Sequence, residues 1–123
     1  MKKKVLLVED NEMNSRLVEF VLERDGFDVT TAATAEEGLK VAGGLRPDII
    51  LMDIQLPGMD GLEATRRLKQ DPQTHDIPVV AITAHAMRGD EERIIASGCR
   101  GYIPKPVNTR ELSATVLSYI KAG

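Results

Sequence analysis

The sequence predicts an α/β fold in which helices cover both faces of a doubly wound, parallel sheet. Short apolar runs alternate with longer amphipathic stretches, and this strand–helix unit occurs five times along the 123 residues. Such alternation is typical of parallel sheets joined by right-handed crossovers. The chain has the length of one ordinary domain, and no repeat or low-complexity linker interrupts it. We therefore expect residues 1–123 to form a single domain.

The five expected strands differ in their burial. Three of them are continuous apolar runs, the pattern of strands that are covered on both faces of a parallel sheet. The other two are shorter and are expected to be more peripheral. In chain order the strands are Lys4–Val8, Phe27–Thr31, Asp48–Asp53, Val79–Thr83 and Gly101–Ile103.

The helices between the strands carry apolar residues at three- and four-residue spacing, and their ends are marked. Three are expected to begin at a capping box or a close variant of it, in which a short polar side chain binds a backbone N–H. These pairs are Thr34 with Glu37, Asp60 with Glu63, and Asn108 with Glu111. The fourth helix is expected over Asp90–Ser97. Helix ends are expected at Gly26, Gly43–Gly44, Asp71–Pro72 and Gly98.

Composition and charge exclude several classes of function. Sixteen Lys and Arg residues against 19 Asp and Glu give a formal charge of −3, which argues against broad electrostatic capture of nucleic acid. The apolar run after Met1 is too short for a signal peptide or a membrane span. The single cysteine, Cys99, fits a reducing cytoplasm. A cytoplasmic protein with a protein partner or small ligand is expected.

Polar side chains lie at the ends of four of the predicted strands or just after them: Glu9–Asp10, Asp53, Thr83 and Lys105. In open α/β sheets, ligands bind outside the carboxyl ends of the strands. Crowded carboxylates there need a cation, because two unit charges about 5 Å apart repel by roughly 3 kcal/mol at an effective dielectric constant near 20. Mg²⁺ suits such a site, whereas zinc is disfavoured because Cys99 and both histidines lie elsewhere in the sequence.

An aspartate, a divalent cation, a lysine and a hydroxyl in one pocket suit transfer of a phosphoryl group to the aspartate. Asp53 is a competent nucleophile that would form an aspartyl phosphate. Lys105 supplies a positive charge for a phosphoryl oxygen, and Thr83 supplies a hydroxyl that can donate or accept. Each of these residues alone is a weak signal, but their common position at strand ends is specific.

Four segments resemble the receiver domains of two-component response regulators, and the resemblance covers the whole chain. They are Val8–Asn11 (VEDN), Leu51–Gly61 (LMDIQLPGMDG), Ala81–Ala84 (AITA) and Tyr102–Pro106 (YIPKP). The resemblance implies a flavodoxin-like (βα)5 fold with strand order 2-1-3-4-5. It is strongest to stand-alone receivers of the DivK type and to receiver modules of hybrid histidine kinases. The start at Met1 and the lack of an output domain after Gly123 favour the stand-alone form, although an excised module would look the same.

The resemblance also implies a role for each site residue. Asp53 would be the phosphoacceptor, with Thr83 and Lys105 contacting the phosphoryl oxygens. Mg²⁺ would be held by Glu9, Asp10 (the more direct ligand of this pair), Asp53 and the backbone carbonyl of Gln55. Tyr102 would be an aromatic switch residue that acts with Thr83. The Lys105–Pro106 peptide bond would be cis.

The implied function is a phosphorylation-controlled binding module of bacterial signalling rather than a turnover enzyme. The phosphoryl group would come from a histidine kinase or a histidine phosphotransfer protein. The downstream target would bind the face made by the fourth helix, the fifth strand and the last helix, with no nucleic acid or membrane involved.

Other interpretations remain. A doubly wound phosphohydrolase also uses Asp, Mg²⁺, Thr and Lys, but it typically carries an acid where Gln55 stands. A flavin carrier would need a phosphate-binding loop after the first strand, where Glu9 and Asp10 would repel a phosphate. Asp10 and Asn11 could merely cap the first helix, and Tyr102 could be a half-buried core aromatic.

Overall fold

The computed structural model describes residues 2–56, 58–84 and 88–122. Pro57, in the segment after Asp53 that carries the resemblance, lies outside the described residues, and so does His85. Within the described ranges, five strands alternate with five helices, as the sequence predicts. The elements are β1 Lys4–Val8, α1 Glu12–Arg24, β2 Asp28–Ala32, α2 Ala35–Leu45, β3 Ile49–Asp53, α3 Gly61–Gln70, β4 Val79–Thr83, α4 Arg88–Ala96, β5 Gly101–Pro104 and α5 Leu112–Ala122.

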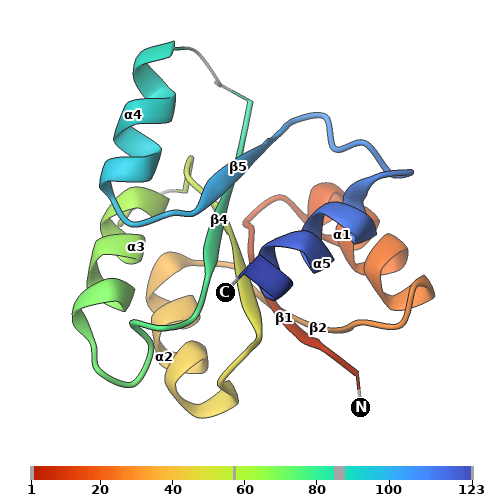
Figure 1. The fold of residues 1–123 in the computed structure, drawn as a ribbon, viewed down its shortest axis with the longest axis horizontal. Helices are drawn as coiled ribbons and strands as arrows, with labels where there is room; N and C mark the ends of the chain where they lie inside the picture. The colour runs from red at the N-terminus through yellow and green to blue at the C-terminus, as the bar shows by residue number, and fades with distance from the viewer. Residues whose placement is uncertain (1, 57, 85–87, 123) are drawn as a thin grey trace.

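The strands form one parallel sheet in the order β2-β1-β3-β4-β5, which confirms the order that the resemblance implies. The helices lie on both sides of this sheet (Figure 1). Residues of α1 and α5 share a hydrophobic core with one face of the sheet, and residues of α2, α3 and α4 share a second core with the other face. The fold is therefore a doubly wound α/β domain.

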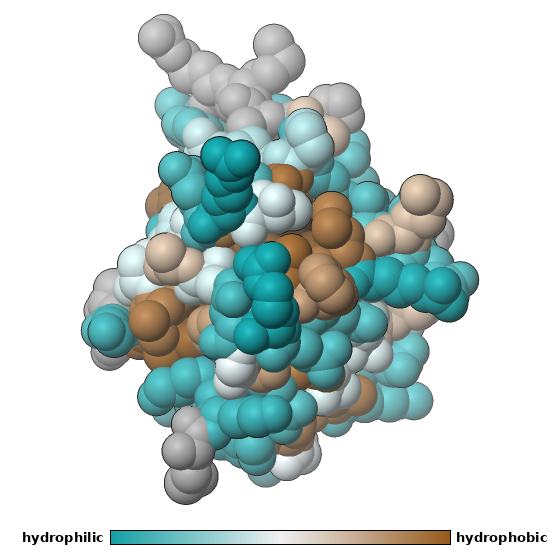
Figure 2. Space-filling view, turned by 90° about the vertical axis from the view of Figure 1, so that its right-hand side faces the viewer, coloured by the Kyte–Doolittle hydropathy of each residue, from teal (hydrophilic) through white to brown (hydrophobic). Residues whose placement is uncertain are grey.

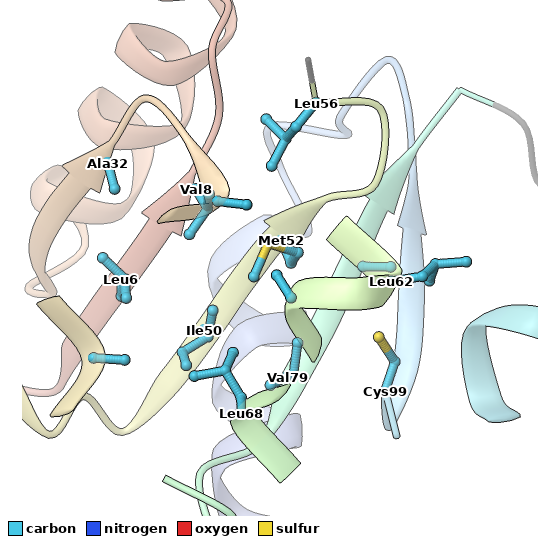
Figure 3. Packing of buried hydrophobic residues seen from close by; sticks show 14 of the residues in the cluster. Leu6, Val8, Ala32, Ile50, Met52, Leu56, Leu62, Leu68, Val79 and Cys99 are labelled. Atoms are coloured by element: carbon cyan, nitrogen blue, oxygen red, sulfur yellow. The ribbon is translucent and has the colours of Figure 1, made fainter. Parts of the chain in front are cut away.

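Alternate residues of the central strands supply the two cores, because successive side chains of a strand point to opposite faces. Leu6, Ile50 and Met52 pack under α2, α3 and α4, where Leu62 and Leu68 of α3 meet them (Figure 3). Their sequence neighbours Val5, Leu7, Ile49 and Leu51 pack under α1 and α5. All seven strand residues are fully buried, which explains why these strands are continuous apolar runs.

Two of the three predicted capping pairs are confirmed. The Thr34 hydroxyl accepts from the Glu37 N–H at 3.1 Å, and the Asp60 carboxylate accepts from the Glu63 N–H at 2.8 Å. The prediction for Asn108 is wrong. Its side-chain oxygen accepts from the N–H of Arg110 at 3.0 Å, and α5 begins only at Leu112. A turn over residues 108–111 therefore precedes the helix.

Some boundaries also differ from the expected ones. β2 starts and ends one residue later than predicted, and α4 begins at Arg88 and ends at Ala96. The predicted stop of α2 at Gly43 and Gly44 is wrong, because the helix continues to Leu45 and is closed by Arg46 in the left-handed conformation, with φ 52°. Arg46 precedes Pro47, and a residue before proline is disfavoured in the α conformation. The proline, rather than the glycines, ends this helix.

None of the helices in the described part of the chain combines the length and the apolar character that crossing a membrane requires.

Candidate functional site

The candidate site lies at the edge of the sheet where the parallel strands end. Glu9 and Asp10 follow β1, Asp53 is the last residue of β3, Thr83 is the last residue of β4, and Lys105 follows β5. Two backbone bonds hold the chain just past the strands. The Glu9 N–H donates to the Ala32 carbonyl at 3.0 Å, and the Lys105 N–H donates to the Thr83 carbonyl at 2.8 Å. The sheet thus continues its hydrogen bonding into the site.

Three carboxylates gather at this edge. One oxygen from each of Glu9, Asp10 and Asp53 lies within 4.8 Å of the other two. Glu9 and Asp53 are buried, with relative exposures of 4% and 2%, whereas Asp10 is exposed to solvent. Asn11, and not Asp10, is the N-cap of α1, and its side chain accepts from the Asn14 N–H at 3.0 Å. Helix capping therefore does not account for Asp10.

Lys105 lies between the two buried carboxylates. Its ammonium group donates to Asp53 Oδ2 at 3.0 Å and lies 3.2 Å from Glu9 Oε1. The other Asp53 oxygen, Oδ1, accepts from the backbone N–H of Gln55 at 2.9 Å. Thr83 is fully buried on the neighbouring strand. The structure therefore brings together the Lys105 ammonium and the carboxylates of Glu9, Asp10 and Asp53, which the sequence places at separate strand ends.

The charges of these groups influence one another. Burial, and then the interaction with Asp53, raise the pKa of Glu9 from 4.5 to about 7, although Lys105 partly opposes the shift. Burial alone would raise the pKa of Asp53. Interactions with Glu9, the Gln55 N–H and Lys105 outweigh burial, so the pKa of Asp53 lies below its usual value. Burial would lower the pKa of Lys105, but Asp53 and Glu9 raise it overall. Asp53 is thus held ionised beside a charged lysine.

The residues present fit a divalent cation. Three carboxylates against one ammonium leave an excess of two negative charges when all are ionised, and this excess is partly buried. Glu9 Oε2 is buried without a hydrogen-bond partner among the described residues, and unsatisfied polar atoms of this kind are rare. Oxygen-rich sites with carboxylates suit Mg²⁺. Glu9, Asp10 and Asp53 could therefore hold this ion.

Gly61, at the start of α3, is a residue that the sequence reasoning did not single out. A Cβ at this position would lie 2.4 Å from the Asp53 carbonyl oxygen and 2.7 Å from the Cα of Ile54. Only glycine lets α3 begin so close to the end of β3. The sequence gives a weak signal, a glycine directly after the capping Asp60, but a single sequence cannot tell a close backbone approach from an ordinary turn.

Tyr102 lies outside the carboxylate cluster. It is half-buried on β5, and its hydroxyl donates a hydrogen bond to Glu91 of α4. The interaction raises the pKa of the Tyr102 phenol, because the ionised phenol could no longer donate to the carboxylate. Three residues further along the chain, the Lys105–Pro106 peptide bond is cis.

An apolar surface adjoins the site on the side of α1. Met13, Leu17 and Phe20 are 82%, 43% and 64% exposed and recur at helical spacing. Leu17 also lines a small hollow together with Glu9, Lys105 and Val107. Figure 2 shows apolar side chains among hydrophilic ones on this side of the molecule. We call Met13, Leu17 and Phe20 the α1 stripe.

Comparison with known proteins gives consistent results. Residues 5–117 match the response regulator receiver domain family. The polar-differentiation response regulators DivK of Brucella anthropi and Brucella ovis are 47% and 46% identical over 120 residues, which cover 98% of this chain and 98% of each relative.

Solved structures are similar as well. The chemotaxis protein CheY4 of Vibrio cholerae has a TM-score of 0.92 and 28% identity, covering 97% of this chain and 99% of the other. The receiver domain of the sensor histidine kinase PA1611 from Pseudomonas aeruginosa has a TM-score of 0.90 and 35% identity, covering 98% of this chain and 99% of the other. In that crystal structure a magnesium ion is coordinated in the active site cleft.

Proposed function

The chain belongs to the family of response regulator receiver domains, and on that premise we propose that it accepts a phosphoryl group on Asp53 and thereby changes its affinity for a protein partner. The observation that carries this proposal is the position of Asp53, whose carboxylate lies 3.0 Å from the Lys105 ammonium within the carboxylate cluster. We further propose that residues 1–123 act as one receiver domain in the bacterial cytoplasm.

The chemistry assigns a role to each residue and two to Asp53. An ionised oxygen of Asp53 attacks the phosphorus of a phosphohistidine, so that a P–O bond forms, the P–N bond breaks and its electron pair returns to the imidazole ring. Lys105 and Thr83 hold the phosphoryl oxygens. Glu9, Asp10, Asp53 and the Gln55 carbonyl would hold Mg²⁺, which, when bound, offsets the negative charge of those oxygens. The low pKa of Asp53 keeps the nucleophile ionised at neutral pH.

A phosphohydrolase of the doubly wound type is the weaker alternative. Gln55 stands two residues after Asp53, where such an enzyme typically has an acid, and its backbone N–H donates to Asp53. An amide side chain cannot act as a general acid or base for a leaving alcohol. We therefore expect a protein that assists its own phosphorylation and dephosphorylation, and not an enzyme with an external substrate.

Incubation with acetyl phosphate and Mg²⁺ is expected to give a single phosphoryl adduct on the intact protein, seen by mass spectrometry. A receiver holds the group on Asp53 long enough to be detected, whereas a hydrolase would release phosphate from many esters over multiple turnovers. Phosphate release from p-nitrophenyl phosphate, measured in parallel, is the control. Rapid turnover of that ester without an adduct would contradict the proposal.

The phosphodonor is proposed to dock on the α1 stripe. A histidine kinase or histidine phosphotransfer protein must bring its phosphohistidine to Asp53, and the stripe is an exposed apolar surface that adjoins the Glu9–Lys105 hollow. Exposed contiguous apolar side chains are typical of protein interaction sites.

Leu17→Asp is expected to slow phosphotransfer from a phosphorylated histidine phosphotransfer protein by at least tenfold. The change removes an apolar contact of about 1.5–3 kcal/mol, which corresponds to roughly ten- to a hundredfold. Labelling by acetyl phosphate should be unchanged, because a small donor needs no docking surface. Ile95→Asp on α4, where Ile95 is 52% exposed, is the matched control. Equal slowing by both variants would count against docking at α1.

We propose that Thr83 and Tyr102 couple phosphorylation of Asp53 to the change in partner binding. A phosphoryl oxygen on Asp53 would draw the Thr83 hydroxyl inward, and Tyr102 would then turn away from α4 into the vacated space. The surface of α4, β5 and α5, where the target is proposed to bind, would change with it. Phosphorylation favours this arrangement only through contacts that are better there.

Thr83→Ala should still accept the phosphoryl group but should show smaller amide shift changes around Tyr102 on activation. A charge-assisted hydrogen bond contributes about 1.5–3 kcal/mol, whereas moving the population of the domain from mostly inactive to mostly active needs roughly 5.5 kcal/mol. Lys105 must therefore supply part of this free energy. Thr83→Ser keeps the hydroxyl and should behave like the wild type. Full-sized changes in Thr83→Ala by NMR would refute this route.

A further inference from the structure

The hydrogen bond between Tyr102 and Glu91 links the side chains of α4 and β5, two neighbouring elements of the proposed output face. Tyr102 belongs to β5, and Glu91 lies in the first half of α4. Glu91 is exposed, so its carboxylate would otherwise face solvent. Water could satisfy this carboxylate equally well, and the bond is therefore not needed to rescue a buried group. Its effect is that the Tyr102 hydroxyl, rather than water or a partner, donates a hydrogen bond to the Glu91 carboxylate.

Each of these two residues lines a hollow of its own. On α4, Glu91 lines a shallow hollow with Glu92, Ile95 and Ala96. On the other side, Tyr102 lines a second hollow between β5 and the start of α5, together with Pro104, Val107, Glu111 and Leu112. The hydrogen bond from Tyr102 to Glu91 therefore links one lining residue of each hollow.

The chemistry of the two hollows points to a cationic ligand. Glu91, Glu92 and Glu111 contribute exposed carboxylates, and Ile95 contributes an apolar side chain that is 52% exposed. Arg93, on the same helix, is bonded to Asp90 at 3.1 Å and does not offset these charges directly. Glu91 and Ile95 are four residues apart and lie on one side of α4. A Lys or Arg beside an apolar side chain would complement them.

We propose that the Tyr102 hydroxyl competes, within the chain, with a partner's cationic side chain for the Glu91 carboxylate. The partner of the active state is a protein segment whose Lys or Arg side chain replaces this hydroxyl at Glu91, while a neighbouring apolar side chain of the segment covers Ile95. The inference rests on the proposed function and names the partner class of its output face. In the resting state the segment must displace the hydroxyl. In the active state Glu91 is available.

The test uses the full chain without any phosphodonor. Two short helical peptides serve as probes, one with lysine and leucine four residues apart and one with glutamate in place of the lysine. Binding is followed through the amide shifts of Glu91 and Ile95 by NMR. Tyr102→Phe removes the hydroxyl but keeps the ring, so it should bind the lysine peptide roughly fivefold more tightly than the wild type, the effect of about one net hydrogen bond.

Two further variants identify the group that is released. Glu91→Gln in the Tyr102→Phe background should abolish the preference for the lysine peptide, whereas Glu92→Gln in the same background should retain most of it. The inference is overturned if wild type and Tyr102→Phe bind the lysine peptide equally well. It is also overturned if Tyr102→Phe binds both peptides equally well, or if neither peptide binds.

The outcome is independent of Asp53. If acetyl phosphate fails to label the protein but Tyr102→Phe binds the lysine peptide more tightly, the proposed function is contradicted and this inference is supported. Labelling of Asp53 by acetyl phosphate, together with unchanged peptide binding in Tyr102→Phe, would support the proposed function and overturn this inference.

Discussion

Asp53→Asn is expected to abolish phosphorylation by acetyl phosphate in the presence of Mg²⁺, with a loss of at least about a hundredfold in labelling rate. The amide of Asn keeps the shape of the side chain but is neutral and far less nucleophilic than a carboxylate. The variant should fold, because Lys105 can still donate to the amide oxygen and to Glu9. Intact mass spectrometry over a time course measures the effect.

Asp48→Asn is the matched control for this prediction. Asp48 precedes the same strand at its opposite end, where its side chain accepts from the Lys4 N–H at 2.8 Å. It should be labelled at the wild-type rate. Labelling of Asp53→Asn at that rate would show that another residue is the acceptor, and Asp10 would then be the first candidate, since it shares the carboxylate cluster.

In the presence of a chelator, the domain is expected to lose stability as the pH rises from about 5 to about 8. The pKa of Glu9 is about 7 in the folded state against 4.5 as the ordinary value, so the folded state binds this proton more tightly. The stabilisation is complete below 4.5 and is lost as the pH rises through 7. It amounts to at most on the order of 3 kcal/mol. Asp53 and Lys105 have pKa values shifted down and up, out of this window, so they add little slope.

Mg²⁺ should reverse this loss, because a cation favours the ionised form of Glu9. At a hundred times its Kd, a ligand of the native state adds about 2.7 kcal/mol, and each kcal/mol raises the Tm of a domain of this size by roughly 4 °C. The rise in Tm should therefore be larger at about pH 8 than at about pH 6.

Two variants distinguish the effect of Glu9 protonation on stability from the effect of Mg²⁺ binding, as measured in thermal melts. Glu9→Gln should flatten the pH dependence in chelator, since an amide does not titrate. Asp10→Asn should keep that dependence but lose most of the Mg²⁺ effect. A pH slope that persists in Glu9→Gln would mean that another group is responsible. An undiminished Mg²⁺ effect in Asp10→Asn would exclude direct coordination by Asp10.

The fold and the meeting of the site residues could be predicted because they follow from local patterns. Continuous apolar runs indicate strands buried on both faces, and parallel strands place their carboxyl ends at one edge. Glu9, Asp53 and Lys105 are therefore predictable neighbours although 44 and 52 residues separate them along the chain. Strand order came from the resemblance, since periodicity alone leaves the order open.

What could not be predicted depends on contacts between elements. The close approach of Gly61 to Asp53 is set by how α3 packs on β3, and the bond from Tyr102 to Glu91 is set by how α4 lies against β5. The Asn108 prediction failed for a related reason. The same short side chain can bond a turn or a helix N-terminus, and the cis peptide bond and turn that follow β5 decide which of the two forms.

The two separate cores of the sheet keep the packing under α1 apart from the packing under α4, whereas α5, which belongs to the proposed output face, shares the core of α1. α1 and α5 pack on one face, whereas α4 packs on the other, and only the strands lie between them. If the phosphodonor docks on the α1 stripe, as proposed, exchanging the solvent-facing residues of α1 for those of a relative is expected to redirect the domain to another phosphodonor and to leave the packing under α4 intact. The proposed donor surface on α1 could thus change in evolution while the α4 part of the proposed output face keeps its packing, and phosphorylation of Asp53 would still link the two.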